Sequence, residues 1–328
     1  MSQPPEASLP FSTAFSRVSV VIPARNEEPR IGQTVGAVFD QAPEGVELEV
    51  VVADDGSTDD TAAVASGAGA RVVPVRSPGE PGSPGAARNR GAAAATGDPI
   101  IFLDADCIPG PGWLAALLAA HAAGETVVGG ALDAPDDLPF TGRCDHYCGS
   151  YHVHPGRPAG YVPNHTPANL SVRRDAFLAT AGFTEQGPVA DGHEELRWQG
   201  QLRRTGTRIR FEPAALVHHH NRTGVGNLLR RHFRWGYSSV EGKAETGTSR
   251  WNLLYRHPRL LIAAGLPLAF AHTFHTLGCW LRAGKVEPVA MLPLLLTAHL
   301  SYAAGLTLGG WRWLRRRGTG TAPVPRWR

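Results

Sequence analysis

The chain has 328 residues, 29 acidic and 32 basic side chains, and a formal net charge of +3. Its length allows one large domain with a full hydrophobic core plus a smaller appendage. The near balance of charge argues against a nucleic-acid-binding protein, and four cysteines in a chain of this size argue against a disulfide framework and fit a reducing compartment.

The first 16 residues are polar, contain Pro and Ser, and lack both a basic start and an apolar run. This pattern is not that of a secretory signal. We therefore expect residues 1–16 to be a flexible tail, and the domain that follows to lie in the cytoplasm.

From residue 17 to about residue 131, short β-branched apolar runs alternate with helical stretches, which predicts a parallel sheet with crossover helices. The expected strands are Val18–Ile22, Leu48–Ala53, Val72–Val75 and Ile100–Leu103. The expected helices are Ile31–Phe39, Thr58–Ala65 and Ala86–Ala95. The fold class is therefore α/β, with a Rossmann-like, mostly parallel central sheet and flanking helices.

Two further segments are predicted to border the site. Residues 76–85 contain Pro or Gly at so many positions that no regular ladder can form, so they are a loop. Residues 134–168 are rich in Pro, Gly, His and aromatic side chains, and we expect them to face the substrate.

Polar clusters follow three of the predicted strands, where an open α/β sheet binds its ligands. The first strand ends in Pro23-Ala24-Arg25-Asn26-Glu27 and the second in Asp54-Asp55-Gly56-Ser57. Carboxylates at the second position can accept hydrogen bonds from a base or a ribose hydroxyl, so Asp54 and Asp55 are predicted to bind a nucleoside. The alternative is a helix-capping turn built on Ser57.

The fourth strand, Ile100–Leu103, runs directly into Asp104-Ala105-Asp106. Two carboxylates beside a buried strand are costly unless a counter-ion neutralises them. A hard divalent cation that bridges carboxylate and phosphate oxygens removes this cost. We expect Asp106 to be the main metal ligand and Asp104 to contact either the metal or a ribose.

A third candidate lies in Gly85–Gly91, where a helix opens with arginines. A helix N-terminus beside an arginine is a site for anions. Arg88 is the predicted ligand-binding residue, and Arg90 is expected to lie on the solvated face of the helix.

Two apolar stretches near the C-terminus, Leu260–Leu281 and Val289–Trp311, contain no Asp, Glu, Lys or Arg. Each is long enough to cross a hydrocarbon core of about 30 Å. The excess of arginine outside the two stretches favours a transmembrane hairpin with both ends in the cytoplasm. Re-entrant helices, interfacial helices on the membrane, or a soluble helical subdomain remain as alternatives.

Taken together, these loops resemble glycosyltransferase family 2, whose members have the GT-A fold. The resemblance covers about residues 17–236, in VSVVIPARNEE, VVADDGSTDDT, GAARNRGAAAATGDPIIFLDAD, ANLSVRRDAFLATAGF, GHEELRWQGQLRRTG and VHHHNRTGVGNLLRRHFRWG. It implies inverting transfer from a nucleotide-diphospho-sugar with Mg2+ or Mn2+. By position it assigns the nucleotide-sugar to Pro23, Ala24, Arg25, Glu27, Asp54, Asp55, Arg88, Asp104 and Asn169.

The family's general base lies in an acidic pair before a helix, and here the register departs from that pattern. The segment reads Asp191-Gly192-His193-Glu194-Glu195-Leu196, with His193 where the usual Asp would fall. An inverting transfer needs one group that takes the acceptor proton. Glu194 is the first candidate, and His193, Asp191 and Glu195 stay open.

Two later motifs complete the predicted site. A metal or diphosphate contact is expected from His218 or His220, because neighbouring side chains of a strand alternate in direction. Arg231, Arg234 and Trp235 resemble a motif of processive synthases in which Gln stands where this chain has Arg231. They could bind an acceptor sugar and phosphate, or belong to an amphipathic helix on the membrane surface.

The expected organisation follows from these segments. The divisions are the tail 1–16, a GT-A domain 17–225 with a nucleotide-sugar half 17–131 and an acceptor half 132–225, a basic juxtamembrane segment 226–258, two candidate transmembrane helices 259–312 and a basic cytoplasmic tail 313–328.

The function expected is transfer of a sugar to a hydroxyl or phosphate acceptor, lipid-linked or close to the membrane, in glycolipid or cell-envelope polysaccharide synthesis at the inner membrane. The alternatives are a nucleotidyltransferase that acts on sugar phosphates and a catalytically impaired protein that binds nucleotide-sugars at the membrane.

Overall fold

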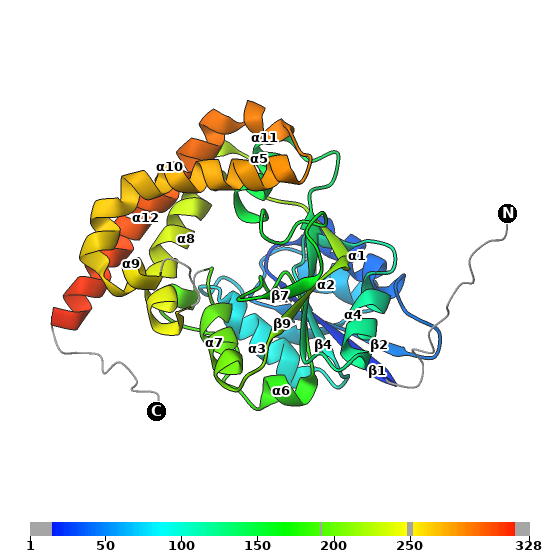
Figure 1. The fold of residues 1–328 in the computed structure, drawn as a ribbon. Coiled ribbons are helices and arrows are strands. Elements are labelled where there is room, and N and C mark those ends of the chain that lie inside the picture. Colours follow the sequence, from blue (N-terminus) through cyan, green and yellow to red (C-terminus); the bar gives the residue numbers. More distant parts are fainter. Residues whose placement is uncertain (1–14, 191, 248–251, 319–328) are drawn as a thin grey trace.

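The computed structural model describes residues 15–190, 192–247 and 252–318 (Figure 1). Its centre is a nine-stranded sheet with the order β3-β2-β1-β4-β8-β6-β9-β5, and β7 pairs with β9. The strands are β1 (Arg17–Ala24), β2 (Glu47–Asp54), β3 (Arg71–Pro74), β4 (Ile100–Leu103), β5 (Cys107–Pro109), β6 (Val127–Asp133), β7 (Gly160–Val162), β8 (Asn169–Val172) and β9 (Ile209–His219).

Helices flank the sheet and form a separate layer at the C-terminal end of the chain. The first set is α1 (Glu28–Phe39), α2 (Thr61–Gly67), α3 (Pro84–Ala94), α4 (Trp113–Ala122), α5 (Phe140–Gly149), α6 (Arg174–Leu178) and α7 (Glu195–Arg204). The second set is α8 (Val225–Thr246), α9 (Asn252–Arg256), α10 (Pro258–Arg282), α11 (Glu287–Ala290) and α12 (Leu292–Gly318). A 3-10 turn covers Pro188–Ala190.

The four strands predicted from the sequence are confirmed, and β3, β2, β1 and β4 are all parallel. Val20, Val21 and Ile22 of β1 are fully buried because helices cover both faces of the sheet. In Figure 1, α3 and α7 lie on one side of the sheet and α1 and α4 on the other. The sheet is mixed beyond β4, since β8 runs antiparallel to both β4 and β6.

The parallel strands end at the same edge, and the following loops therefore lie close together. One bond fixes the loop after β4, since Thr34 of α1 donates its hydroxyl to the carbonyl oxygen of Ala105 at 2.7 Å. The segment between Asp104 and Asp106 is thereby held against the first crossover helix.

The two apolar stretches form the helices α10 and α12, which are long and apolar enough to cross a membrane by length and composition. They run antiparallel, because Gly265 lies beside Thr307 while Gly310 lies beside Ile262. α12 packs between α10 and α8, at the side of the sheet domain (Figure 1). The helix continues past the expected end at residue 312 to Gly318. The expected tail segments 1–14 and 319–328 lie outside the described residues.

Candidate active site

Asp106 faces His219 across the edge of the sheet. β5 pairs antiparallel with β9 so that Cys107 is opposite His219, and the imidazole Nε2 lies 3.2 Å from Asp106 Oδ1. Burial alone would raise the pKa of Asp106, but His219, Arg231 and Arg222 outweigh it and lower the pKa to about 2. Burial acts to lower the pKa of His219, and Asp106 raises it overall. The pair is thus a site of concentrated charge.

The donor set at this point suits a divalent cation. Ligand atoms of Asp106, Cys107 and His219 lie within 4.8 Å of one another. Burial raises the pKa of the Cys107 thiol well above its usual value, which keeps it protonated and makes it a poor ligand for a hard ion. A carboxylate with an imidazole fits Mn2+ or a similar ion. Asp104 is outside this group of ligand atoms and its carboxylate is bonded to Arg88, so a metal contact from Asp104 stays a prediction.

The histidine at this carboxylate is His219, whereas His218 or His220 was expected. Strand residues alternate in direction, so His219 points to the opposite face of β9 from His218, while His220 lies beyond the end of the strand. His220 still lies at the site, since its backbone N–H donates to the Asp106 carbonyl oxygen at 2.9 Å. In the described part of the chain, Nδ1 of His218 and Nδ1 of His220 are buried without a hydrogen-bond partner. A role for either in metal binding stays a prediction.

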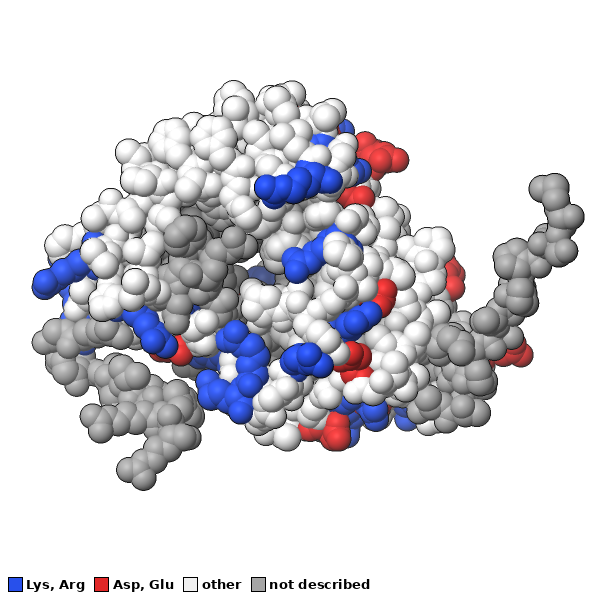
Figure 2. Space-filling model, in the orientation of Figure 1, with Lys and Arg blue, Asp and Glu red and all other residues white. Residues whose placement is uncertain are grey.

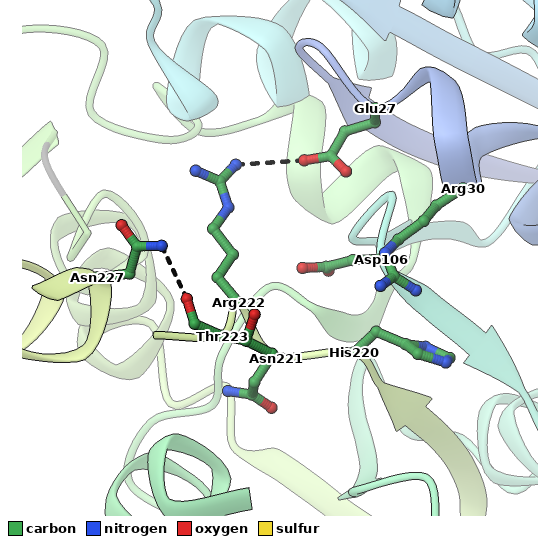
Figure 3. A pocket seen from close by; sticks show the side chains of 8 residues that line it. All are labelled: Glu27, Arg30, Asp106, His220, Asn221, Arg222, Thr223 and Asn227. Atoms are coloured by element: carbon green, nitrogen blue, oxygen red, sulfur yellow. Dashed lines mark hydrogen bonds and ion pairs between the residues drawn. The ribbon is translucent and has the colours of Figure 1, made fainter. Parts of the chain in front are cut away.

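A cavity of about 280 Å³ opens beside Asp106 (Figure 3). It is lined by Glu27, Arg30, Asp106, His220, Asn221, Arg222, Thr223 and Asn227. The Arg222 side chain extends toward Glu27, and its guanidinium pairs with the Glu27 carboxylate at 3.2 Å (Figure 3). Burial and the charge of Asp106 together raise the pKa of Glu27. The cavity therefore combines two arginines with two carboxylates, a polar wall suited to phosphate oxygens and a cation.

Arg30 and Arg222 were missed in the sequence. Arg30 lies in the first turn of α1, where an arginine looks like an ordinary surface residue. Arg222 follows the three histidines by two positions, and its place in the loop after β9 is the signal that could have identified it.

Arg88 connects the turn after β4, the candidate metal site, to the candidate base. Its guanidinium donates to the carboxylates of both Asp104 and Glu194, and its side chain is 5% exposed. α3 can approach this closely because position 85 is glycine, where a Cβ would lie 2.3 Å from the Thr184 carbonyl oxygen. The prediction for Arg88 was contact with the nucleotide, and in the structure it holds two carboxylates in place.

Glu194 and Glu195 are adjacent buried carboxyl groups in different electrostatic surroundings. Burial raises the pKa of Glu194, and the ion pair with Arg88 offsets this only in part. Burial and the neighbouring Glu194 raise the pKa of Glu195 to about 8. Within the described residues, Oε2 of Glu194 is buried and has no hydrogen-bond partner, so it is available to accept a proton.

The other two candidates for the base differ from Glu194. His193 Nδ1 is bonded to the hydroxyl of Ser238 at 2.7 Å, and burial lowers the pKa of His193 well below its usual value. It is therefore a neutral imidazole that anchors α8. Asp191 lies outside the described residues.

The nucleotide side of the edge is built around Asp55. Its carboxylate accepts from the Nε of Arg76 at 2.9 Å and from the backbone N–H of Ser83, while Arg25 donates to the Asp55 carbonyl oxygen at 2.6 Å. Asp54 accepts from Ser57 and closes the turn. The helix-capping alternative does not form, because the N-cap residue of α2 is Asp60. Pro23 and Ala24 form the end of β1 directly beside this group.

Asn169 requires a correction. It was expected to shape the sugar pocket, but it is fully buried between β8, β6 and β9. Its amide donates to the carbonyl oxygens of Ala131 and Ala215 at 3.0 and 2.8 Å, and its oxygen accepts from Trp113 Nε1 at 2.9 Å. Asn169 joins the sheet, and both of its N–H donors are used within the core.

The motif formed by Arg231, Arg234 and Trp235 lies on α8, and the Arg231 side chain points into the protein. Arg231 pairs with the buried Asp145, which also lies 3.2 Å from His232 Nε2. The Arg231 guanidinium lies 5.3 Å from the Trp235 ring, and the charge of Asp106 also raises the pKa of Arg231. Arg234, one turn further along the helix, is exposed. Arg231 and Trp235 therefore lie where α8 meets α5.

Comparison with known proteins gives a consistent result. Residues 19–180 match the family Glycosyl transferase family 2. The pre-mycofactocin glycosyltransferase of Mycobacterium tuberculosis is 31% identical over 284 residues, which cover 80% of this chain and 53% of that protein. The glucosyl-3-phosphoglycerate synthase of Mycolicibacterium smegmatis is 41% identical over 118 residues, or 34% of this chain and 38% of that protein. The chain thus spans about half the length, or less, of these curated relatives.

Two solved structures share the fold. A mannosyltransferase from Pyrobaculum calidifontis in complex with GDP-Man and Mn2+ aligns over 93% of this chain and 91% of its own, with a TM-score of 0.61 and 19% identity. The glucosyl-3-phosphoglycerate synthase of M. tuberculosis with Mn2+ and UDP aligns over 75% and 87%, with a TM-score of 0.51 and 22% identity. The GT-A-like arrangement expected from the sequence is therefore confirmed.

Proposed function

The chain belongs to glycosyltransferase family 2, and we propose that it transfers a sugar with inversion from a nucleotide-diphospho-sugar to a hydroxyl or phosphate acceptor. One observation carries the proposal. Arg88 joins Asp104, in the turn that offers a metal site, to Glu194, which has a free carboxylate oxygen. Arg88 thus connects the candidate site for the leaving diphosphate, at Asp104, with the candidate proton acceptor, Glu194.

A divalent ion, Mg2+ or Mn2+, would be held by Asp106 and His219 with a contribution from Asp104. When bound, it would neutralise the negative charge that develops on the departing diphosphate. The residues fit this group because the low pKa of Asp106 supplies a carboxylate at neutral pH beside an imidazole. The Mn2+ bound in two structures of the same fold supports the assignment.

The diphosphate fits the cavity beside Asp106. Arg30 and Arg222 line it, and both can donate hydrogen bonds to phosphate oxygens. Arg222 is paired with Glu27 at 3.2 Å, so binding of a diphosphate would exchange one anionic partner for another. The nucleoside would then lie toward Asp55 and Arg25, at the ends of β1 and β2.

Glu194 is the proposed general base. Arg88 holds one of its oxygens, and the second can take the proton of the acceptor hydroxyl as that oxygen attacks the anomeric carbon. The bond from the anomeric carbon to the diphosphate oxygen breaks on the opposite face, and a nucleoside diphosphate leaves. Glu195, with a pKa of about 8, keeps its proton at neutral pH and adds no second negative charge beside Glu194.

The acceptor is proposed to be lipid-linked or close to the membrane, with the catalytic domain, residues 17–225, at the cytoplasmic face of the inner membrane. Two observations support this. The helices α10 and α12 are long and apolar, and Arg231 and Trp235 lie on α8, the helix that packs against α12. The product would belong to glycolipid or cell-envelope polysaccharide synthesis.

A donor screen tests the proposal. Isolated membranes or purified protein are incubated with UDP-, GDP- and dTDP-sugars, with and without Mn2+, and the nucleotide product is identified. Metal-dependent release of a nucleoside diphosphate supports glycosyl transfer. Release of pyrophosphate would identify a nucleotidyltransferase, and donor binding without any turnover would identify a catalytically impaired protein.

A further inference from the structure

We infer that the C-terminal hairpin rests on one leaflet of a lipid bilayer through the outer face of α10, and that neither α10 nor α12 crosses the bilayer. The inference rests on the membrane attachment proposed above and states how the attachment is made. Four observations carry it: the packing of α12, the anchoring of α8, the contacts of the hairpin tip and the character of the outer face.

α12 is packed against α8 along its second half. Gly305 and Gly309 bring the backbones into contact, since a Cβ at Gly305 would lie 2.1 Å from the Phe233 carbonyl oxygen. Polar groups join the two helices as well, with Tyr302 bonded to Lys243 at 3.0 Å and Arg312 to the Tyr237 hydroxyl at 2.8 Å. α8 and the second half of α12 therefore form one unit.

α8 is in turn bound to the catalytic domain. Arg197 of α7 pairs with Glu241 at 3.1 Å and with Glu245 at 2.8 Å. At the other end of α8, Arg231 pairs with Asp145 of α5. A bilayer around α12 would also have to surround these charged side chains of α8, at a large cost in free energy.

The tip of the hairpin is attached to the same domain. Glu287 accepts from the Tyr147 hydroxyl at 2.8 Å and pairs with Arg143 at 2.8 Å, and Trp280 Nε1 donates to the Tyr147 carbonyl oxygen at 2.9 Å. A hairpin that crossed the membrane would carry Glu287 about 30 Å away from α5, to the far side of the hydrocarbon core. The start and the tip of the hairpin thus lie on the same side.

α10 is the outer helix of this layer, and its outward face is apolar. Large apolar side chains recur along its whole length, at spacings of four to seven residues, and each is 43% to 61% exposed: Leu260, Leu266, Phe270, Phe274 and Leu281. The region over α10 and α12 in Figure 2 is largely free of charged side chains. An apolar face of this length on the surface marks an interaction site.

The charges at both ends of α10 favour a bilayer over a second copy of the chain. Exposed basic residues flank the face, Arg256 and Arg259 before it and Arg282 and Lys285 after it. Pairing α10 with α10 of another copy, in either direction, would bring basic ends together. Anionic lipid headgroups instead complement both ends at once.

The inference is tested by labelling single cysteines in sealed membranes from a Gram-negative host. Lys285→Cys reports on the tip and Glu80→Cys, in the exposed loop after β3, on the catalytic domain, both in a Cys279→Ser background. The remaining cysteines are buried. A membrane-impermeant maleimide should label both positions in inverted vesicles and neither in spheroplasts. Labelling of Lys285→Cys in spheroplasts, with Glu80→Cys unlabelled, would overturn the inference.

A second measurement addresses the outer face itself. Purified protein should float with vesicles of phosphatidylcholine and phosphatidylglycerol, and Phe270→Asp/Phe274→Asp should bind at least tenfold more weakly. Leu178→Asp, an exposed apolar position on α6, is the matched control and should bind as the original chain does. Unchanged binding of the double variant would contradict the assigned role of α10. So would the finding that the original chain is a dimer without detergent and that the double substitution makes it monomeric.

These outcomes separate the two proposals. If the unaltered protein binds no vesicle and no cell membrane, the membrane attachment in the proposed function fails. If it binds membranes and its tip is labelled from the outside, the attachment holds and only the placement of the hairpin is wrong.

Discussion

The Arg88 guanidinium and the Glu194 carboxylate form a buried ion pair, with side chains that are 5% and 6% exposed. The same guanidinium also holds Asp104. Because three charged groups from α3, the turn after β4 and the start of α7 meet here, this pair ties the Asp104 turn to the proposed base.

Removal of the guanidinium should therefore affect both stability and turnover. Arg88→Ala leaves the buried carboxylate of Glu194 and the partly exposed carboxylate of Asp104 without this partner, and a broken buried pair costs about 3 to 5 kcal/mol. We expect a lower free energy of unfolding in urea and loss of donor turnover, with partial recovery in Arg88→Lys. Arg90→Ala, exposed on the same helix, is the control. If Arg88→Ala kept both the free energy of unfolding and the donor turnover of the original chain, Arg88 would have no role in connecting Asp104 to Glu194.

Glu195 predicts a pH dependence of stability. Its pKa is about 8 in the folded chain and about 4.3 when unfolded. Between these values the folded state holds one proton more, so this group stabilises the fold fully below about pH 4.3 and its contribution falls as the pH rises to about 8. Glu195→Gln should thus raise the Tm more at pH 8.5 than at pH 5.5. An equal shift in Tm at both pH values would contradict the assignment.

The metal site predicts a difference between adjacent histidines. His219 lies 3.2 Å from Asp106, and His218 points to the other face of β9. His219→Ala should raise the Mn2+ concentration needed for half-maximal turnover by about tenfold or more. His218→Ala should leave it within a factor of two or so, as expected for a side chain off the ligand set. The reverse order would move the metal to the other face of the strand.

Asn169 should matter for folding and not for substrate affinity. Asn169→Ala removes the donors of two buried carbonyl oxygens, and each unsatisfied group costs about 1 to 3 kcal/mol. We expect a clear loss in the free energy of unfolding, with the donor KM of the folded fraction unchanged. A raised KM at normal stability would restore the pocket role expected from the sequence.

The sheet could be predicted from the sequence because its signals are local. The runs Val18–Ile22 and Ile100–Leu103 are β-branched, apolar and short, and each is followed by polar residues at the end of the strand. The relation of Asp104 and Asp106 to the sheet edge followed from this pattern alone. These positions depend on no contact distant in sequence.

The pairing of distant side chains could not be predicted in this way. Which of the three histidines meets Asp106 depends on the register of β9 against β5 and β6, and this register shifts between Gly130 and Ala131. A single step of register turns every side chain to the other face. The sequence likewise contains no sign that Arg88 would bridge Asp104 to Glu194, which lies 106 positions from Arg88 in the chain.

Asn169 shows the same limit in a different form. Its position in the chain matched a ligand-binding motif, but the direction of its amide is set by Gly130, where a Cβ would lie 2.2 Å from Asn169 Nδ2. Only the absence of a side chain at position 130 lets the amide reach the carbonyls of the neighbouring strands. That relation exists in the folded sheet and in no local pattern.

The central claim, that Asp106 belongs to the metal site and Glu194 is the base, is tested most directly by separating donor binding from turnover. Mn2+-dependent binding of the nucleotide-sugar and release of the nucleoside diphosphate are measured for the unaltered chain, Asp106→Asn and Glu194→Gln. The account predicts that Asp106→Asn loses both, while Glu194→Gln binds the donor and loses turnover by at least about 100-fold, the scale of general base catalysis. Turnover retained in both variants would contradict it.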